Sequence, residues 1–188
     1  AGYVVRDPAR RPSNWRATRT LDDELVAQAI VGISHIDTRA LTRHLRDRGA
    51  MRVGISSVST DVDALLTRVR LHPKMEGADL VAHVTCQAPY VVPARGPRRA
   101  TVAAIDLGIK ANTPRELAER GVEVHVLPAS STADDVFAID PDGVFFSNGP
   151  GDPATADHAV ELAVAALTAN LPVFGICFGH QVIGRALG

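Results

Sequence analysis

Short apolar runs alternate with helical segments throughout the second half of the chain. The apolar runs begin at Val102, Val122, Gly143 and Pro172, and a segment of helical periodicity follows each of them. Alternation at this spacing is typical of βαβ units, so residues 100–188 are predicted to form a parallel sheet with right-handed crossovers. Ligand sites of such sheets lie beyond the carboxyl ends of the strands.

The predicted helices of this half have recognisable boundaries. They cover residues 113–120, 133–139 and 156–169, and a last helix follows Cys177. The second can be capped by Ser131 or Thr132, because a hydroxyl oxygen at that position accepts a free N–H group of the first turn.

The first half of the chain has a mixed pattern that predicts an α+β arrangement, without a derivable topology. Residues 37–49 predict a capped helix that stops at Gly49. Arginines occupy one side of this helix, and the other side carries Ala40, Leu41, His44 and Leu45. Thr20 precedes acidic residues that suit the first turn of another helix, and residues 62–69 predict a third.

Residues 89–99 separate the two halves. They contain three prolines and one glycine and have no amphipathic period, so they are predicted to be a linker between domains at residues 1–88 and 100–188. The charge changes sign near this point. Residues 1–100 hold 16 Lys and Arg against 10 Asp and Glu, whereas residues 101–188 hold 4 against 11.

Composition excludes several classes of protein. Of the 188 residues, 46% are hydrophobic and 22% are charged, which is typical of a soluble globular chain. No apolar run is long enough for a membrane span, and no signal-peptide core is present. Two cysteines cannot form a disulfide framework and favour a reducing, cytoplasmic location. The net charge of −1 gives no reason to expect nucleic acid, and no residue cluster has metal-ligand spacing.

The sequence GICFGHQ at residues 175–181 has the form of a nucleophile elbow at a strand-to-helix turn. Such a turn strains the central residue, Cys177, and crowds Gly175 and Gly179, which must lack side chains. The helix N-terminus favours the thiolate form of Cys177, and the N–H of Phe178 is placed to bind an oxyanion. The alternative is a buried cysteine at a strand end, which is also the interpretation of Cys86. The flanking strand and helix favour the nucleophile.

Two further loops follow predicted strands. SNGPGDP at residues 147–153 is a fixed turn with exposed N–H groups, a candidate wall of the substrate pocket beside Cys177. DLGIK and the residues after it, Asp106 to Asn112, form either a structural turn with Asn112 as helix cap or a direct part of the site.

Together, GICFGHQ and SNGPGDP resemble the class I glutamine amidotransferases, which hydrolyse glutamine and deliver ammonia. The segments IDTRALTRHLR, PSNWR and DLGIKANTPREL are similar to one branch of that family, the small glutamine-hydrolysing subunits of carbamoyl-phosphate synthetases. The resemblance covers essentially the whole chain. It implies a partial mixed α+β small-subunit domain followed by the first half of a parallel-sheet amidotransferase domain.

The resemblance also implies roles for individual residues. Cys177 is the nucleophile that forms a γ-glutamyl thioester, Gly149 and Gly151 are glutamine-binding backbone positions, and Gln181 contacts the substrate. Phe178 matches an oxyanion and substrate position that is often leucine in the family. The implied partner is a large subunit that uses ATP, magnesium and bicarbonate, so that this chain itself binds no cofactor. Arginine and pyrimidine biosynthesis are the implied pathways.

The histidine and glutamate that complete the family's triad lie well beyond the elbow. His180 follows Cys177 on the same helix and is expected to point away from the thiol, and His125 and His158 carry no supporting motif. The sequence is therefore expected to be an internal fragment. An isolated polypeptide of these residues is expected to lack useful glutaminase activity and to aggregate through an unpaired edge strand.

Three other interpretations compete with this one. A non-catalytic docking module would keep the fold without the activity. Another class I amidotransferase, such as those of anthranilate or GMP synthesis, would not carry the IDTRALTRHLR segment. An α/β-hydrolase with a cysteine elbow would not explain SNGPGDP.

Overall fold

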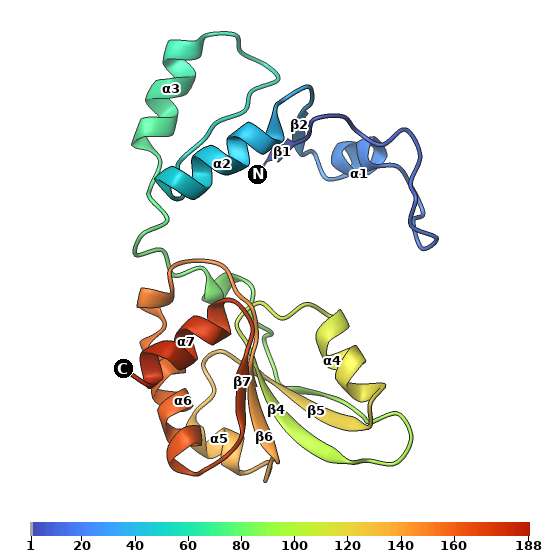
Figure 1. The fold of residues 1–188 in the computed structure, drawn as a ribbon, viewed down its shortest axis with the longest axis vertical. Helices are drawn as coiled ribbons and strands as arrows, with labels where there is room; N and C mark the ends of the chain where they lie inside the picture. The colour runs from blue at the N-terminus through green and yellow to red at the C-terminus, as the bar shows by residue number, and fades with distance from the viewer. Residues whose placement is uncertain (1) are drawn as a thin grey trace. The chain divides into compact units, whose positions relative to one another are not determined.

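A computed structural model describes residues 2–188 of the chain (Figure 1). The chain divides into two compact units, of which the first ends at Lys74 and the second is Met75–Gly188. Unit 1 has a two-stranded sheet with helices, and unit 2 has a five-stranded, mostly parallel sheet with helices. The predicted fold class is confirmed.

Unit 1 is built from two short strands and three helices. They are β1 (Gly2–Val4), α1 (Leu21–Ala27), β2 (Val31–Ile33), α2 (Thr38–Arg48) and α3 (Val62–Leu71). β1 and β2 pair in parallel. No described residue of unit 1 is fully buried. In α2, Leu41 and Leu45 are half-buried, whereas Ala40 and His44 are exposed, so the predicted apolar side of this helix is only partly packed.

Local side-chain chemistry starts and ends the helices of unit 1 as predicted. Thr20 and Asp23 form a reciprocal capping box at the start of α1. Asp37 caps α2 by accepting the N–H of Ala40 at 2.9 Å. Gly49 follows α2 with a φ of +82°, a conformation that glycine adopts without strain.

The sheet of unit 2 has the strand order β3-β5-β4-β6-β7. Its strands are β3 (Tyr90–Val92), β4 (Ala100–Asp106), β5 (Val122–Pro128), β6 (Gly143–Phe146) and β7 (Val173–Gly175). β3 is antiparallel to β5, and the other neighbours are parallel. The carboxyl ends of β4, β6 and β7 therefore lie side by side at one edge of the sheet.

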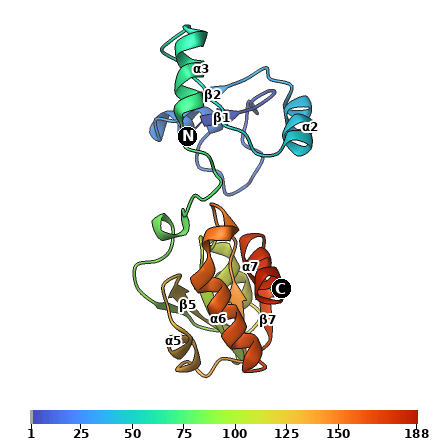
Figure 2. The ribbon, with the colours of Figure 1, turned by 90° about the vertical axis from the view of Figure 1, so that its left-hand side faces the viewer.

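Helices cover both faces of this sheet. They are α4 (Asn112–Ala118), α5 (Ala133–Phe137), α6 (Asp157–Thr168) and α7 (Phe178–Ala186), with two 3₁₀ turns, η1 (Val81–His83) and η2 (Pro153–Thr155). Figure 1 shows α5, α6 and α7 on one face and α4 on the other, and Figure 2 looks onto the face with α5, α6 and α7. The larger apolar core lies on the three-helix face and includes Ile105, Phe146, Leu162 and Val182.

The prediction that residues 89–99 form a linker without sheet pairing is wrong for the first residues of that segment. Tyr90–Val92 forms β3, which pairs with Val124–Val126 of β5. Pro89 and Pro93 flank this strand and do not interrupt it, so its three residues all keep their N–H groups. The strand also lies at the edge of the sheet, where proline is tolerated. The division between compact units lies earlier, between Lys74 and Met75.

β7 lies at the opposite edge of the sheet among the described strands, as predicted. Its Phe174 side chain is 65% exposed and stacks on Phe145 of β6 at a ring-centroid distance of 6.1 Å. The α4 face of the sheet thus keeps exposed apolar surface next to the turn that leads into α7.

Candidate active site

Three loops meet at the carboxyl ends of β4, β6 and β7. The Asn148 side-chain amide donates to the carbonyl oxygen of Gly108 at 2.8 Å, which joins the loop after β6 to the loop after β4. The N–H of Gly179 donates to the carbonyl oxygen of Ser147 at 3.1 Å, which joins the same loop to the start of α7. The segments DLGIK, SNGPGDP and GICFGHQ are therefore parts of one structure.

Cys177 occupies the turn between β7 and α7 in a strained conformation. Its φ is +50° and its ψ is −107°, outside the regions that residues with a Cβ ordinarily adopt. It directly precedes the first turn of α7, and it is exposed. Strain at an exposed cysteine that begins a helix is the geometry of a nucleophile elbow, and the strain predicted from the sequence is confirmed.

The two glycines of the elbow are required by close backbone contacts. A Cβ on Gly175 would lie 2.5 Å from the carbonyl carbon of Gly179. A Cβ on Gly179 would lie 2.2 Å from the carbonyl oxygen of Phe146. Both distances are far below van der Waals contact, so the predicted crowding is confirmed.

The amide groups around Cys177 divide into paired and unpaired ones. Gly179 N–H is paired with the carbonyl oxygens of Ser147 and Ile176. In the described part of the chain no hydrogen bond is made by the N–H of Phe178, the residue after the cysteine. The residue is 3% exposed and its side chain belongs to the core, so its ring is not a surface for substrate, and its N–H is a donor without a partner among the described residues.

The SNGPGDP loop is held rigidly and leaves two amides free. Ser147 Oγ accepts the N–H of Leu107 at 2.9 Å and donates to the carbonyl oxygen of Asn148. A Cβ on Gly149 would lie 2.3 Å from the oxygen of Leu107, and Gly151 has a φ of +95°. Among the described residues the N–H groups of Gly149 and Gly151 have no hydrogen-bond partner. The loop thus presents free donors on a fixed backbone.

Asp106 organises the loop after β4. The residue is 4% exposed, and its carboxylate accepts N–H groups from Cys86 at 2.9 Å, Gly108 at 2.9 Å and Ile109 at 2.7 Å. These bonds favour the structural-turn interpretation of DLGIK. Asn112 does not cap α4, since it is the first residue of the helix and its Oδ1 accepts from Arg115 instead.

Gln181 lies one helical turn after Cys177. Its N–H donates to the carbonyl oxygen of Cys177 at 3.1 Å, and its side chain is exposed. This backbone bond places Gln181 one helical turn from the cysteine, at the start of the same helix.

Two histidines of unit 2, His125 and His158, have hydrogen-bond partners away from Cys177. His125 Nε2 lies 3.2 Å from Glu123 Oε1 on β5, and His158 Nε2 lies 2.9 Å from the carbonyl oxygen of Ser131. His180 is exposed on α7. Within residues 2–188 no hydrogen bond joins a histidine to the Cys177 thiol.

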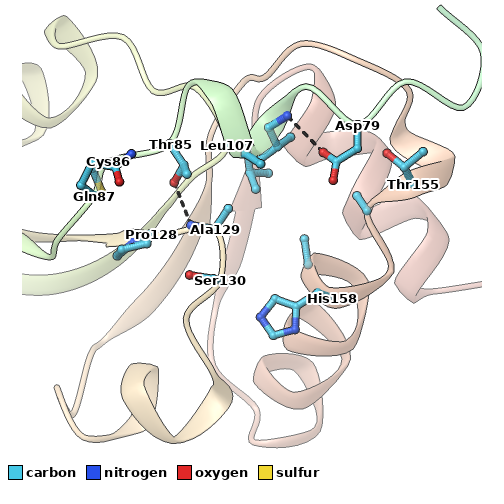
Figure 3. Close-up of a pocket in the computed structure, with 14 residues that line it drawn as sticks. Asp79, Thr85, Cys86, Gln87, Leu107, Pro128, Ala129, Ser130, Thr155 and His158 are labelled. Atoms are coloured by element: carbon cyan, nitrogen blue, oxygen red, sulfur yellow. Dashed lines mark hydrogen bonds between the residues drawn. The ribbon is translucent and has the colours of Figure 1, made fainter.

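A cavity that sequence reasoning missed lies beyond the carboxyl ends of β4 and β5 (Figure 3). Its volume is about 460 Å³, and Cys177 does not line it. The polar side chains around it are Asp79, Thr85, Gln87, Ser130, Thr155 and His158. No sequence motif marks the cavity-lining segment around Thr85. Long-range hydrogen bonds hold this segment at the cavity, such as the one that the N–H of Ala129 donates to Thr85 Oγ1 at 2.9 Å, and the sequence alone does not reveal them.

Cys86 also lines this cavity. The residue is half-buried, and burial together with the negative charge of Asp106 raises the pKa of its thiol. A raised pKa disfavours the reactive thiolate. The interpretation of Cys86 as a packing residue agrees with this environment.

The described residues contain neither a cluster of metal ligands nor a helix that could span a membrane. Among residues 2–188, no three His, Cys, Asp or Glu side chains come together as a metal site. No helix in this same part of the chain has the length and apolar character needed to cross a membrane.

Comparison with known proteins gives a family match at each end of the chain. Residues 103–188 match the family described as Glutamine amidotransferase class-I, and residues 1–55 match Carbamoyl-phosphate synthase small chain, CPSase domain. The chain is 65% identical over 190 residues to the carbamoyl phosphate synthase small chain of Streptomyces coelicolor and 58% identical over 193 residues to that of Mycobacterium tuberculosis. All of this chain is covered in both comparisons, and it spans about half the length of these relatives, 50% and 51%.

Proposed function

We propose that the chain is part of a glutamine-hydrolysing small chain of carbamoyl-phosphate synthase. Residues 103–188 match the class-I glutamine amidotransferases, and residues 1–55 match the CPSase domain of carbamoyl-phosphate synthase small chains. The observation that carries the proposal is the conformation of Cys177. An exposed cysteine with positive φ starts a helix, between two glycines that tolerate no Cβ, inside the segment that matches the amidotransferase family.

The proposed reaction begins with attack of the Cys177 sulfur on the side-chain carbonyl carbon of glutamine. A carbon–sulfur bond forms, and the carbonyl oxygen takes up negative charge. The free N–H of Phe178 and those of Gly149 and Gly151 are donors of the kind that stabilise such an oxyanion. Because the last two sit on a rigid loop, little reorganisation accompanies the reaction.

The second half of the reaction releases the products. The carbon–nitrogen bond breaks, and the leaving nitrogen takes the thiol proton through a general base and departs as ammonia. Water then attacks the thioester, which releases glutamate and restores the thiol. The family resemblance assigns the base to a histidine oriented by a glutamate. Gln181, which follows Cys177 by one helical turn, is proposed to contact the substrate.

The proposed partner is a large chain that receives the ammonia. The relatives are named small chains, which supports a partner of this kind. ATP, magnesium and bicarbonate would be used by that partner rather than by the residues described here. The pathways proposed for the product are those to arginine and pyrimidines, in the cytoplasm.

The main alternative is a docking module with the fold but not the activity. The free amides and the strained cysteine favour the enzyme, because neither serves a purely structural purpose. Another class I amidotransferase is disfavoured, since residues 1–55 match the CPSase domain of small chains.

The test replaces Cys177 by serine in a full-length small chain assembled with its large chain. Glutamine-dependent carbamoyl phosphate synthesis should be lost, while synthesis from added ammonia should continue. Cys86→Ser is the matched control, because it removes the other cysteine and should leave both rates near wild type. Glutamine-dependent synthesis by the Cys177→Ser enzyme at near wild-type rate would refute the proposal.

A further inference from the structure

The SNGPGDP loop is tied to a segment that lies 75 positions earlier in the chain. The Asp152 carboxylate accepts the N–H of Gly77 at 2.8 Å through Oδ2 and that of Ala154 at 2.9 Å through Oδ1. The N–H of Asp152 donates to the carbonyl oxygen of Ala78 at 2.9 Å. Asp152 and residues 77–78 are thus paired in both directions.

Gly151 continues this contact. A Cβ on it would lie 2.6 Å from the oxygen of Ala78 and 3.1 Å from the nitrogen of Leu80. The backbone of residues 77–80 therefore packs directly against the backbone that carries the free amide of Gly151. From the other side, the Arg185 guanidinium donates to the carbonyl oxygen of Pro153 at 2.7 Å, which holds the loop to α7.

We propose that Asp152 is a positioning residue for glutamine hydrolysis, which fixes the amides of Gly149 and Gly151 by tying their loop to residues 77–80. The inference rests on the proposed function. Donors for an oxyanion are effective only when their direction is set before the reaction, and displacements of about 1 Å have large effects on rate. Asp152 is adjacent to Gly151, so loss of its bonds frees that amide to turn.

Asp142 provides a matched control at the amino end of the sheet. Its carboxylate accepts the N–H of Thr101 at 2.7 Å, and its own N–H donates to the carbonyl oxygen of Thr101 at 2.8 Å. This is the same reciprocal pairing with a distant segment, but it precedes β6 rather than following it. The Asp142 carboxylate accepts one hydrogen bond and that of Asp152 accepts two, each carboxylate has one partner in a distant segment, and only Asp152 lies in the loop.

The experiment compares Asp152→Asn with Asp142→Asn in the full-length small chain assembled with its large chain. Asp152→Asn should lower kcat/KM for glutamine by about tenfold or more and leave ammonia-dependent synthesis within about twofold of wild type. Asp142→Asn should keep both rates within about twofold. The ratio of the glutamine-dependent rate to the ammonia-dependent rate distinguishes a positioning role from a general loss of stability, because a loss of stability lowers both rates together.

Hydrogen exchange gives a readout that does not depend on activity. Amides of residues 77–80 and 148–152 should exchange faster in Asp152→Asn than in wild type, and should be unchanged in Asp142→Asn. An unchanged rate ratio, equal effects of the two variants, or unchanged exchange in these segments would overturn the inference. A wild-type enzyme without glutaminase activity would instead overturn the proposed function, and the exchange data would still decide whether Asp152 fixes the loop.

Discussion

The α-carbon of Gly179 packs against the carbonyl oxygen of Phe146, so closely that a Cβ would lie 2.2 Å from that oxygen. The same oxygen accepts the N–H of Ile176 at 3.1 Å. The carboxyl end of β6 thus holds the elbow both before and after Cys177. The position of the candidate nucleophile is set by the neighbouring strand as well as by its own turn.

Gly179→Ala should therefore destabilise unit 2 by about 1–3 kcal/mol or more, because the methyl group meets backbone that cannot move aside. Gly184→Ala is the matched control. It lies in the same helix with nothing within 4 Å of its Cβ position, so alanine should be neutral or stabilise by up to about 1 kcal/mol. Urea unfolding measures both variants, and equal stability of the two would contradict the crowding.

The two cysteines should react with iodoacetamide at different rates. Cys177 is exposed, whereas Cys86 is half-buried, and burial beside Asp106 raises the pKa of its thiol. At about pH 7, Cys177 should be alkylated about tenfold faster or more, as measured by peptide mass spectrometry. In urea the difference should vanish. Faster labelling of Cys86 in the folded protein would contradict this assignment.

Association with the large chain should slow as salt rises. Unit 1 holds 13 Lys and Arg against 8 Asp and Glu, and α2 carries the exposed arginines Arg39, Arg43, Arg46 and Arg48. A basic surface speeds encounter with an acidic partner, and salt screens that attraction. Stopped-flow association should show a strong salt dependence that Arg39→Gln/Arg43→Gln weakens. A rate independent of salt would exclude this steering.

Unit 2 should lose stability in acid. The N–H of Thr132 lowers the pKa of Asp135, and the N–H of Gly77 lowers that of Asp152. Because these carboxylates ionise more readily in the folded chain, their contribution to stability is complete above their unfolded pKa of about 4 and is lost as the pH falls below it. The urea midpoint should fall in this range.

Asp135→Asn provides the check on that acid dependence. It removes the carboxylate from the capping box of Thr132, so the midpoint should be lower at neutral pH and should change less on acidification. If the variant keeps the full acid dependence of the wild type, the effect comes from other groups.

Some features of this protein followed directly from the sequence. The caps at Thr20, Asp37 and Thr132, the strand–helix alternation of unit 2 and the strained turn at Cys177 are all properties of a few consecutive residues. Local hydrogen bonds and side-chain periodicity determine such features, so they can be predicted without knowledge of distant contacts.

Other features depended on residues that are far apart in the chain. β3 forms because β5 offers a free edge, and Gly151 and Asp152 meet residues 77–80 because the sheet brings both segments to its carboxyl end. The cavity between Thr85 and His158 arises in the same way. The sequence alone determined which turns and helices form, whereas packing in three dimensions decided which backbone groups of the described residues are paired and which, like the amide of Phe178, have no hydrogen-bond partner.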